Sequence, residues 1–272
     1  MDDLSKTTLL QPGEPPAFEV VNPDGKSAAF LICDHASNLI PRRLGTLGLS
    51  EAERAEHIAW DPGAASMARR LSELLDAPLV LSGYSRLVID CNRPLDSTQL
   101  TAPVSGGVTV PGNESVSAGD RAARIAELHQ PYHDTIEAML EARGGRPTLL
   151  LSIHSFTPEL DDGPRPWRIA IAYGSDDRLA RLLIPALRED GTVVGDNQPY
   201  SVAAWSDYSI PVHGERHGIP HVLVETRQDG IRTAETAAVW AEKLADAYRR
   251  IEAQALRLGR PGPGQSSETP AS

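Results

Sequence analysis

The chain has 272 residues, of which 40% are hydrophobic, enough for one large α/β domain or two small ones. Its formal net charge of −11 argues against nucleic acid or an anionic membrane surface as a partner. No apolar run approaches the roughly 20 residues of a membrane span, and the first residues lack the basic and apolar regions of a signal peptide.

The two ends of the chain differ in composition from the middle. Residues 1–17 are polar and contain prolines, and residues 259–272 read GRPGPGQSSETPAS. Segments of this kind bury too little apolar surface to offset the entropy lost on folding. We therefore expect flexible termini at 1–17 and 259–272, and one folded domain without internal repeats at 18–258.

Between these ends, short apolar runs alternate with longer segments of helical periodicity. The apolar runs are continuous, which suits strands buried on both faces of a sheet. In one longer segment, Ile125, Leu128 and Tyr132 recur at steps of three and four residues, as on one face of a helix. In chain order, the predicted elements are the strand Ala28–Cys33, the helix Glu51–Leu75, the strands Pro78–Leu81 and Leu87–Ile89, the helix Ala118–Arg143, the strands Leu149–Ile153 and Arg168–Tyr173, the helix Asp177–Arg188, the strand His221–Glu225 and the helix Thr233–Leu258. This order predicts an α/β fold, a single αβα domain with a mostly parallel or mixed central sheet.

Four of the predicted strands end in polar residues that can do chemistry. His35 and His154 follow two of them, and Asp90 and Glu225 end two others. In open α/β sheets, ligands bind beyond the carboxyl ends of the strands. A lone histidine at a strand end is more often structural than catalytic, but four such endings together favour a functional site.

His35 and His154 are candidate ligands of a zinc ion. Zinc hydrolases hold the metal with two or three imidazoles or carboxylates and leave one position for water. Asp61, in the segment HIAWDPGA, is a candidate third ligand; the alternative is that it caps a helix with Pro62 in the first turn. Asn38, three residues after His35, is a neutral amide and ranks lower.

Glu225 is the candidate general base. It ends a strongly β-forming run, where burial would raise the pKa of its carboxyl toward neutrality. Such a carboxylate can take a proton from water and pass it to a leaving amine. The alternative is a salt bridge with Arg227, two residues further along the same strand face, and the two roles are compatible.

The segment YSRLVIDCNRP carries candidate groups for binding a substrate carboxylate. Arg86, Asn92 and Arg93 place two guanidinium groups and an amide near the predicted metal, and arginine binds carboxylates through two hydrogen bonds at once. The alternative is a structural ion pair between Asp90 and one of the arginines. Arg227 is a further candidate for the same task.

The remaining histidines are weaker candidates. His213 and His217 lie in a glycine-containing loop before the last strand, and His213 is predicted to contact the substrate or to stabilise an oxyanion. His57, four residues before the proposed ligand Asp61, is another histidine that could face the metal. His129 and His133 have a metal-chelating spacing, but a structural or supporting role is favoured.

Two classes of chemistry find no support in the sequence. Cys33 and Cys91 each lie inside an apolar run, unlike an activated thiolate, and two lone cysteines suit a reducing cytoplasm. Neither a GxGxxG nor a Walker loop is present, which argues against a nucleotide cofactor.

Several of these segments together resemble one known family. The segments SRLVIDCNRP, DHAS, HQPYH, SIHSFTP and HGIPHVLVETRQD, within about residues 28–250, are similar to the N-formylglutamate amidohydrolases, which more distantly resemble zinc carboxypeptidases and aspartoacylases. The resemblance implies a three-layer αβα, phosphorylase/hydrolase-like fold. It also implies that His35 and His154 bind the metal, that Glu225 is the base, and that Arg86 with Asn92 and Arg93 holds a carboxylate. The wider group has glutamate where this chain has Asn38, which leaves the third ligand between Asn38 and Asp61.

The resemblance implies metal-dependent hydrolysis of the amide bond of an N-acyl acidic amino acid, such as N-formyl-L-glutamate, with zinc or another divalent metal. The alternatives are a related zinc amidase or carboxypeptidase with another acyl or peptide substrate, and a non-catalytic small-molecule binding protein on the same fold. We expect a cytoplasmic protein with a small-molecule substrate and neither a nucleic-acid nor a membrane partner. The sequence predicts no oligomeric state.

Overall fold

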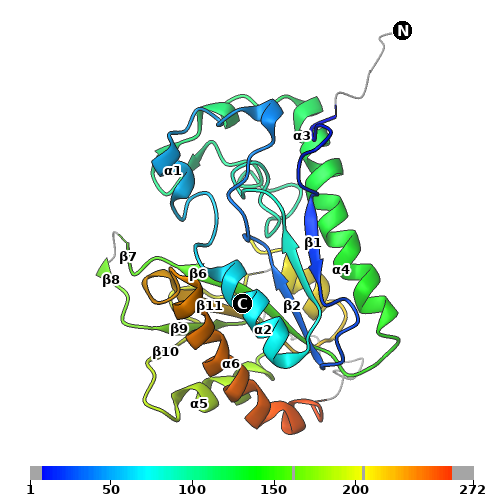
Figure 1. Cartoon of the computed structure of the whole chain (residues 1–272), viewed down its shortest axis with the longest axis vertical. Helices are drawn as coiled ribbons and strands as arrows, with labels where there is room; N and C mark the ends of the chain where they lie inside the picture. Colours follow the sequence, from blue (N-terminus) through cyan, green and yellow to red (C-terminus); the bar gives the residue numbers. More distant parts are fainter. Residues whose placement is uncertain (1–7, 161–162, 204–205, 259–272) are drawn as a thin grey trace, which may run out of the picture.

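A seven-stranded mixed sheet forms the centre of the molecule (Figure 1). The computed structural model describes residues 8–160, 163–203 and 206–258. Within the sheet the strands follow the order β1-β3-β2-β6-β11-β9-β10. Their bounds are β1 (Phe18–Val21), β2 (Ala29–Cys33), β3 (Leu79–Ser82), β6 (Leu149–Phe156), β9 (Ile169–Ala172), β10 (Val194–Asp196) and β11 (His221–Arg227). β1 is antiparallel to β3 and β9 is antiparallel to β11, whereas the other neighbours are parallel, so the expected mixed sheet is confirmed.

Helices cover both faces of this sheet. They are α1 (Glu51–Ala55), α2 (Ala64–Leu75), α3 (Ala118–Arg124), α4 (Gln130–Ala142), α5 (Ala180–Arg188) and α6 (Ala234–Ala255), with π-helical turns at Ile125–His129 and Ile210–Glu215. Two small hairpins, β4 (Val104–Ser105) with β5 (Val108–Thr109) and β7 (Glu159–Leu160) with β8 (Gly163–Pro164), lie outside the main sheet. One face packs against α2, α5 and α6, and the other packs against α4. The three αβα layers are therefore confirmed.

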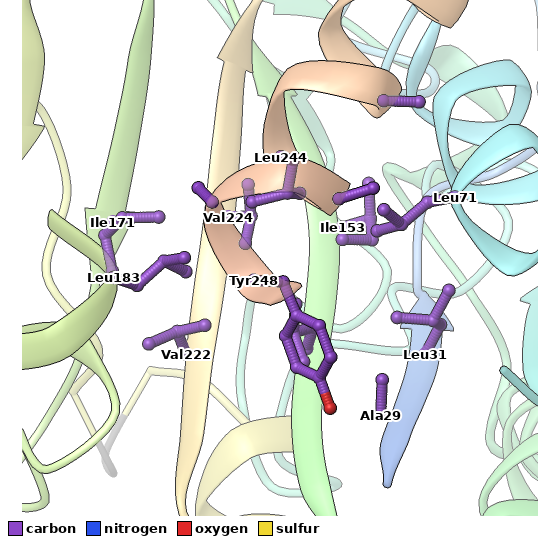
Figure 2. Packing of buried hydrophobic residues seen from close by; sticks show 14 of the residues in the cluster. Ala29, Leu31, Leu71, Ile153, Ile171, Leu183, Val222, Val224, Leu244 and Tyr248 are labelled. Carbon is purple, nitrogen blue, oxygen red and sulfur yellow. The ribbon is translucent and has the colours of Figure 1, made fainter. Parts of the chain in front are cut away.

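The strands are apolar throughout because both of their faces are buried. Leu31 of β2 belongs to one apolar cluster with Leu71 of α2 and Leu244 of α6 (Figure 2), whereas its neighbour Phe30 belongs to the cluster on the opposite face, with Tyr132 of α4. Successive strand side chains point to opposite faces, so a strand covered on both sides needs apolar residues at every position. This explains why the continuous runs in the sequence predicted the strands correctly.

One predicted strand is wrong. Residues Leu87–Ile89 form a turn in a long loop, and their side chains pack into a separate apolar cluster with Leu47, Ile58 and Leu128. Side chains satisfy their backbone carbonyls: Asn113 donates to Leu87 O and Arg124 to Val88 O. A buried apolar run requires core neighbours and paired carbonyls, and here a loop core supplies both without a sheet.

One predicted helix is divided in two. The segment expected to be continuous from Glu51 to Leu75 forms α1 and α2, and residues 56–63 between them are not helical. Pro62 and the left-handed Gly63 (φ 84°) precede α2, and Asp61 N donates to His35 O. The break brings Asp61 beneath the end of β2, where its side chain takes part in the site described below.

The expected flexible ends differ from the structure in one part. Residues 8–17 are packed against the domain: Leu9 is buried, and its backbone N–H and that of Leu10 both donate to Glu127. Residues 1–7 and 259–272 lie outside the described residues. None of the helices in the described residues is long and apolar enough to span a membrane.

Replacing Gly63 with alanine is expected to lower the free energy of unfolding by about 2–5 kcal/mol, measured by denaturant titration. A Cβ at this residue would lie 2.1 Å from the carbonyl oxygen of Ile231, and its backbone has a positive φ. Gly107 is the matched control because its φ is also positive (78°) but a Cβ there would meet nothing within 4 Å. Equal losses from Gly63→Ala and Gly107→Ala would show that close packing at Gly63 contributes nothing.

Candidate active site

Three neighbouring strands bring the predicted chemistry to one edge of the sheet. β2 pairs with β6, and β6 pairs with β11 so that His154 and Glu225 are directly opposite one another. His35 lies two residues beyond the end of β2. The carboxyl ends of these parallel strands therefore meet where the sequence predicted a site, because the pairing places their last residues side by side.

His35, Asp61 and His154 form a buried cluster whose potential ligand atoms all lie within 4.8 Å of one another. Asp61 Oδ2 is 2.9 Å from His154 Nδ1 and 3.4 Å from His35 Nδ1. Asn38 does not line this site; its amide donates to the carbonyl of Arg54. Of the two alternatives for a third ligand, the geometry therefore favours Asp61.

Two further carboxylates orient the histidines from behind. His154 Nε2 lies 3.0 Å from Asp34 Oδ2, and His35 Nε2 lies 2.7 Å from Asp90 Oδ1. Each imidazole thus uses Nε2 for an outer carboxylate and turns Nδ1 toward Asp61. Histidines that bind metals in proteins are commonly held in this way by a carboxylate on the other ring nitrogen.

The cluster fits a divalent cation. His35 Nδ1 is buried without a hydrogen-bond partner among the described residues, as expected of an atom that ligates a metal. Two imidazole nitrogens and a carboxylate oxygen are a donor set typical of zinc.

The charges around the cluster also favour a bound cation. The buried carboxylates Asp61 and Asp90 face the guanidinium of Arg86, and the buried carboxylate of Asp34 pairs with His154. With neutral histidines, this group carries two more negative than positive charges. Burial acts to lower the pKa of His154, but Asp34 and Asp61 outweigh it and raise that pKa well above its ordinary value. The site therefore attracts positive charge, which a divalent cation would supply.

Glu225 lies beside this cluster with an unused oxygen. The residue is 7% exposed, and its Oε2 has no hydrogen-bond partner among the described residues. Burial raises the pKa of its carboxyl to about 7. Arg227 does not neutralise it, because that guanidinium pairs with Asp229 and donates to the carbonyl of Arg165. The alternative salt bridge between Glu225 and Arg227 is therefore wrong.

A cavity of about 280 Å³ joins these groups. His35, Asp61, His154 and Glu225 all line it. A volume of this size admits a small molecule. Beside these four, its polar lining includes His57, Arg86, Asn92, Arg93, Ser155, Thr157, Tyr200, Asp207 and Gln228.

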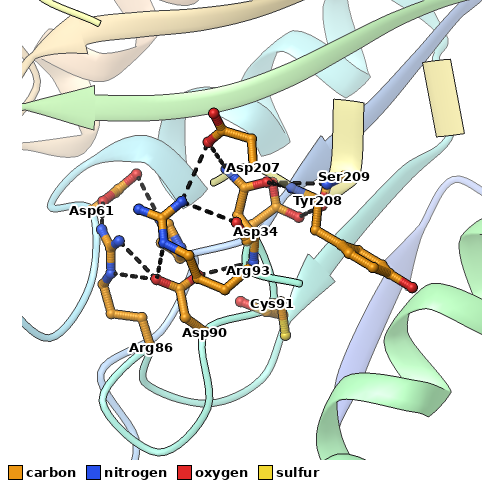
Figure 3. A network of polar contacts seen from close by, with 12 residues as sticks. Asp34, Asp61, Arg86, Asp90, Cys91, Arg93, Asp207, Tyr208 and Ser209 are labelled. Atoms are coloured by element: carbon orange, nitrogen blue, oxygen red, sulfur yellow. Dashed lines mark hydrogen bonds and ion pairs between the residues drawn. The ribbon is translucent and has the colours of Figure 1, made fainter. Parts of the chain in front are cut away.

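The two arginines predicted to bind substrate line the cavity, but both are already paired. Arg86 donates from Nε and Nη2 to Asp90 Oδ2 at 3.1 and 2.8 Å (Figure 3). Arg93 donates from Nη1 to Ser206 O at 2.6 Å and to Asp207 Oδ1 at 3.3 Å. The structural ion pair with Asp90 and a position in the cavity wall therefore coexist.

The other predicted substrate contacts have different surroundings. Asn92 lines the cavity, but its amide donates to Asp207 and accepts from the backbone of Tyr208 and Ser209, so it holds that loop in place. Neither His213 nor the Arg227 described above is among the lining residues.

His213 belongs to a separate buried histidine group. Its Nε2 lies 2.9 Å from His133 Nδ1, and its Nδ1 lies 3.3 Å from Glu137. The His129 ring lies against His133 at a tilt of 50°, with the ring centres 4.4 Å apart, and His217 contacts Glu137. The supporting role favoured for His129 and His133 agrees with this arrangement. Of the weaker histidine candidates, His57 is the one that lines the cavity.

Sequence reasoning missed several groups around the cavity. Gln228 and Tyr200 line it, and Arg165 contacts its wall. Tyr200 and Arg165 lie outside the family-like segments, and Gln228 lies within HGIPHVLVETRQD but was assigned no role there. The nearest signal is spacing, since Gln228 follows Glu225 by three residues and directly follows β11.

The chain is similar to a known protein family and to proteins of known structure. A family model described as N-formylglutamate amidohydrolase matches residues 27–232. A gene product of Agrobacterium tumefaciens of known structure is similar, with 35% identity and a TM-score of 0.85 over 90% of this chain and 99% of that chain. The N-formylglutamate amidohydrolase of Ralstonia eutropha JMP134 shares the fold, with 17% identity and a TM-score of 0.63 over 89% of this chain and 99% of that chain. None of the curated proteins matches the chain.

Proposed function

The chain belongs to the N-formylglutamate amidohydrolase family, and we propose that it is a metal-dependent enzyme acting on an N-acyl acidic amino acid such as N-formyl-L-glutamate. Membership in this family makes it a hydrolase of linear amide C–N bonds. The observation that carries the proposal is the buried His35–Asp61–His154 cluster beside Glu225 in one small cavity.

His35, Asp61 and His154 would hold the metal, with zinc as the proposed ion and another divalent metal as the alternative. A metal held there would polarise the amide carbonyl and lower the pKa of a water molecule. Asp34 and Asp90 keep the two imidazoles in the tautomer that leaves Nδ1 free to ligate.

Glu225 would move the proton during hydrolysis. Its carboxylate takes a proton from the attacking water as the new C–O bond forms, and returns it to the amide nitrogen as the C–N bond breaks. For a formyl substrate the products are formate and the free amino acid. The unused Oε2 and the pKa of about 7 suit this task, since a base of that strength accepts and releases protons near neutral pH.

Arg86 and Arg93 would bind the carboxylate next to the substrate's amide nitrogen. Both guanidinium groups line the cavity, and their partners Asp90 and Asp207 fix them in position. Asn92 supports this arrangement by holding the loop that carries Asp207. Planar guanidinium groups held in this way can add hydrogen bonds to a carboxylate without losing further side-chain freedom.

The test is an assay of formate release from N-formyl-L-glutamate, beside N-acetyl-L-glutamate and N-formyl-L-aspartate, on protein whose metal content is measured. We expect about one metal per chain and turnover of at least the formyl substrates. Metal-loaded protein that releases another acyl group or cleaves a peptide instead would favour a related amidase or carboxypeptidase. Protein that binds these compounds without metal or turnover would be a binding protein on this fold.

We also propose a cytoplasmic location. Cys33 and Cys91 are free and buried, and burial raises the pKa of both thiols well above the ordinary value. Unpaired thiols of this kind persist most readily in a reducing compartment.

A further inference from the structure

Arg165 is a buried cation without a carboxylate partner among the described residues. It is 5% exposed, and its guanidinium carbon lies 5.0 Å from the centre of the Tyr200 ring and 5.8 Å from that of Phe156. Its Nη1 donates to the Tyr200 hydroxyl at 3.1 Å and to the Thr157 hydroxyl at 3.2 Å, and its Nε has no hydrogen-bond partner in the part of the chain that the structure describes. A buried charge of this kind is costly unless an opposite charge reaches its surroundings.

The position of Arg165 relates it to the cavity. Its three neighbours Phe156, Thr157 and Tyr200 all line the cavity, so the guanidinium lies directly behind that wall. The other two cations near the cavity, Arg86 and Arg93, already face carboxylates of the protein. An additional negative charge on a substrate is therefore favoured most beside the wall that Arg165 supports.

Gln228 supplies a second unsatisfied group in the same cavity. It is 6% exposed and lines the cavity, yet its side-chain amide makes no hydrogen bond with the described residues. Asn92, which carries the same functional group and also lines the cavity, makes three hydrogen bonds. Buried amides are normally paired, so the Gln228 amide is poised to bind a ligand.

We propose that Tyr200 and Gln228 bind the side-chain carboxylate of the substrate, with Arg165 as the residue that positions Tyr200. Arg165 donates to the Tyr200 oxygen, which leaves the hydroxyl proton free for a substrate oxygen. A Gln228 N–H donates to the other oxygen, and the nearby guanidinium favours the negative charge. This inference rests on the proposed function, because it assigns the end of the cavity that selects an acidic side chain.

The experiment compares N-formyl-L-glutamate with N-formyl-L-glutamine, which differ only in the distal group. The measured quantity is the ratio of their kcat/KM values in Tyr200→Phe, Gln228→Leu and Arg165→Met. We expect the ratio to fall roughly tenfold or more in each variant, through a higher KM for the acidic substrate, with the glutamine analogue little changed. Arg168→Met is the matched control, because Arg168 is an exposed arginine that does not line the cavity.

Folding is checked separately by melting temperature. Gln228→Leu should melt no lower than the parent, because its amide makes no hydrogen bond with the residues that the structure describes. Tyr200→Phe removes one hydroxyl from a residue that is 43% exposed. If Arg165→Met does not fold, Tyr200→Phe and Gln228→Leu still test whether this part of the cavity binds the side-chain carboxylate. Ratios within twofold of the parent in folded Tyr200→Phe and Gln228→Leu, or an equal fall in Arg168→Met, would overturn the proposal.

A failure of the proposed function gives a different pattern. If the parent turns over neither formyl compound, binding is read from the rise in melting temperature with L-glutamate and with L-glutamine. We expect L-glutamate to stabilise the parent more than L-glutamine, and expect this difference to shrink in Tyr200→Phe and Gln228→Leu. Equal stabilisation of the parent by the two amino acids would overturn the carboxylate subsite as well.

Discussion

Glu225→Gln is expected to lower kcat roughly 10²–10⁴-fold, the usual contribution of a positioned proton-transfer group. Glutamine keeps the shape of the side chain and one acceptor oxygen but cannot take a proton from water. Because Glu225 makes no salt bridge with Arg227, the change leaves no cation unpaired. We therefore expect unchanged metal content, an unchanged or higher melting temperature and little change in KM.

The pH profile supplies a second readout for Glu225. Burial raises the pKa of this carboxyl to about 7, and a bound cation would lower it again by favouring the ionised form. The carboxylate is the active form of a general base, so activity of the parent should fall as the pH drops through or below about 7. This acid limb should be absent from the residual activity of Glu225→Gln.

The matched control is Glu137→Gln, which makes the same change outside the cavity. Glu137 contacts His213 and His217 and is not a lining residue. Its variant should keep the parental kcat and acid limb. A stable, metal-loaded Glu225→Gln with near-parental kcat would remove Glu225 from the mechanism.

His154→Ala and Asp61→Asn are expected to lose the metal and nearly all activity. Loss of a residue that only orients a ligand typically costs 10–100-fold in metal affinity, so loss of a ligand should cost more than about 100-fold. Metal content after dialysis against a metal buffer, together with formate release, measures both effects. His35→Ala should behave in the same way.

Stability must be followed in these variants as well. Removing His154 leaves Asp34 without an imidazole partner in a buried position, and breaking a buried charged pair typically costs about 3–5 kcal/mol. Metal content is therefore compared only among folded samples. Asp61→Asn is the milder change, because asparagine keeps the shape and removes the charge.

Asn38→Ala is the control that separates the two candidates for the third ligand. Its amide donates to the Arg54 carbonyl outside the cavity, so this variant should keep its metal and activity. Metal lost from Asn38→Ala but retained by Asp61→Asn would reverse the assignment. Metal retained by both His35→Ala and His154→Ala would end the two-histidine assignment altogether.

The sequence by itself determined the layers of the fold and the edge of the sheet where the site lies. Strands covered on both faces need continuous apolar runs, and this local pattern predicted β2, β3, β6, β9 and β11. The rule that ligands bind beyond strand ends then selected His35, His154 and Glu225 without knowledge of any contact. The predicted strands are present and these three side chains line one cavity, because each strand and its end residue are set by residues adjacent in the chain; the roles of the three residues stay predictions.

Only the tertiary structure decided how those residues are paired. Asp61 meets His154 across 93 positions, and only that contact separates a helix cap from a candidate ligand. The pairs of Arg86 with Asp90 and of Arg227 with Asp229 are local, four and two residues apart, but the sequence left open which arginine Asp90 pairs with and whether Arg227 pairs with Glu225.

The unsatisfied groups around the cavity could not be found in the sequence for the same reason. Nothing local distinguishes Arg165 or Gln228 until folding buries them and leaves Arg165 Nε and Gln228 Nε2 without a hydrogen-bond partner among the described residues. Conversely, the apolar run Leu87–Ile89 resembles a strand until a loop core and the side chains of Asn113 and Arg124 satisfy it. Burial and hydrogen-bond partners are set by segments far apart in sequence, so local patterns determine the elements and only the assembled fold determines their contacts.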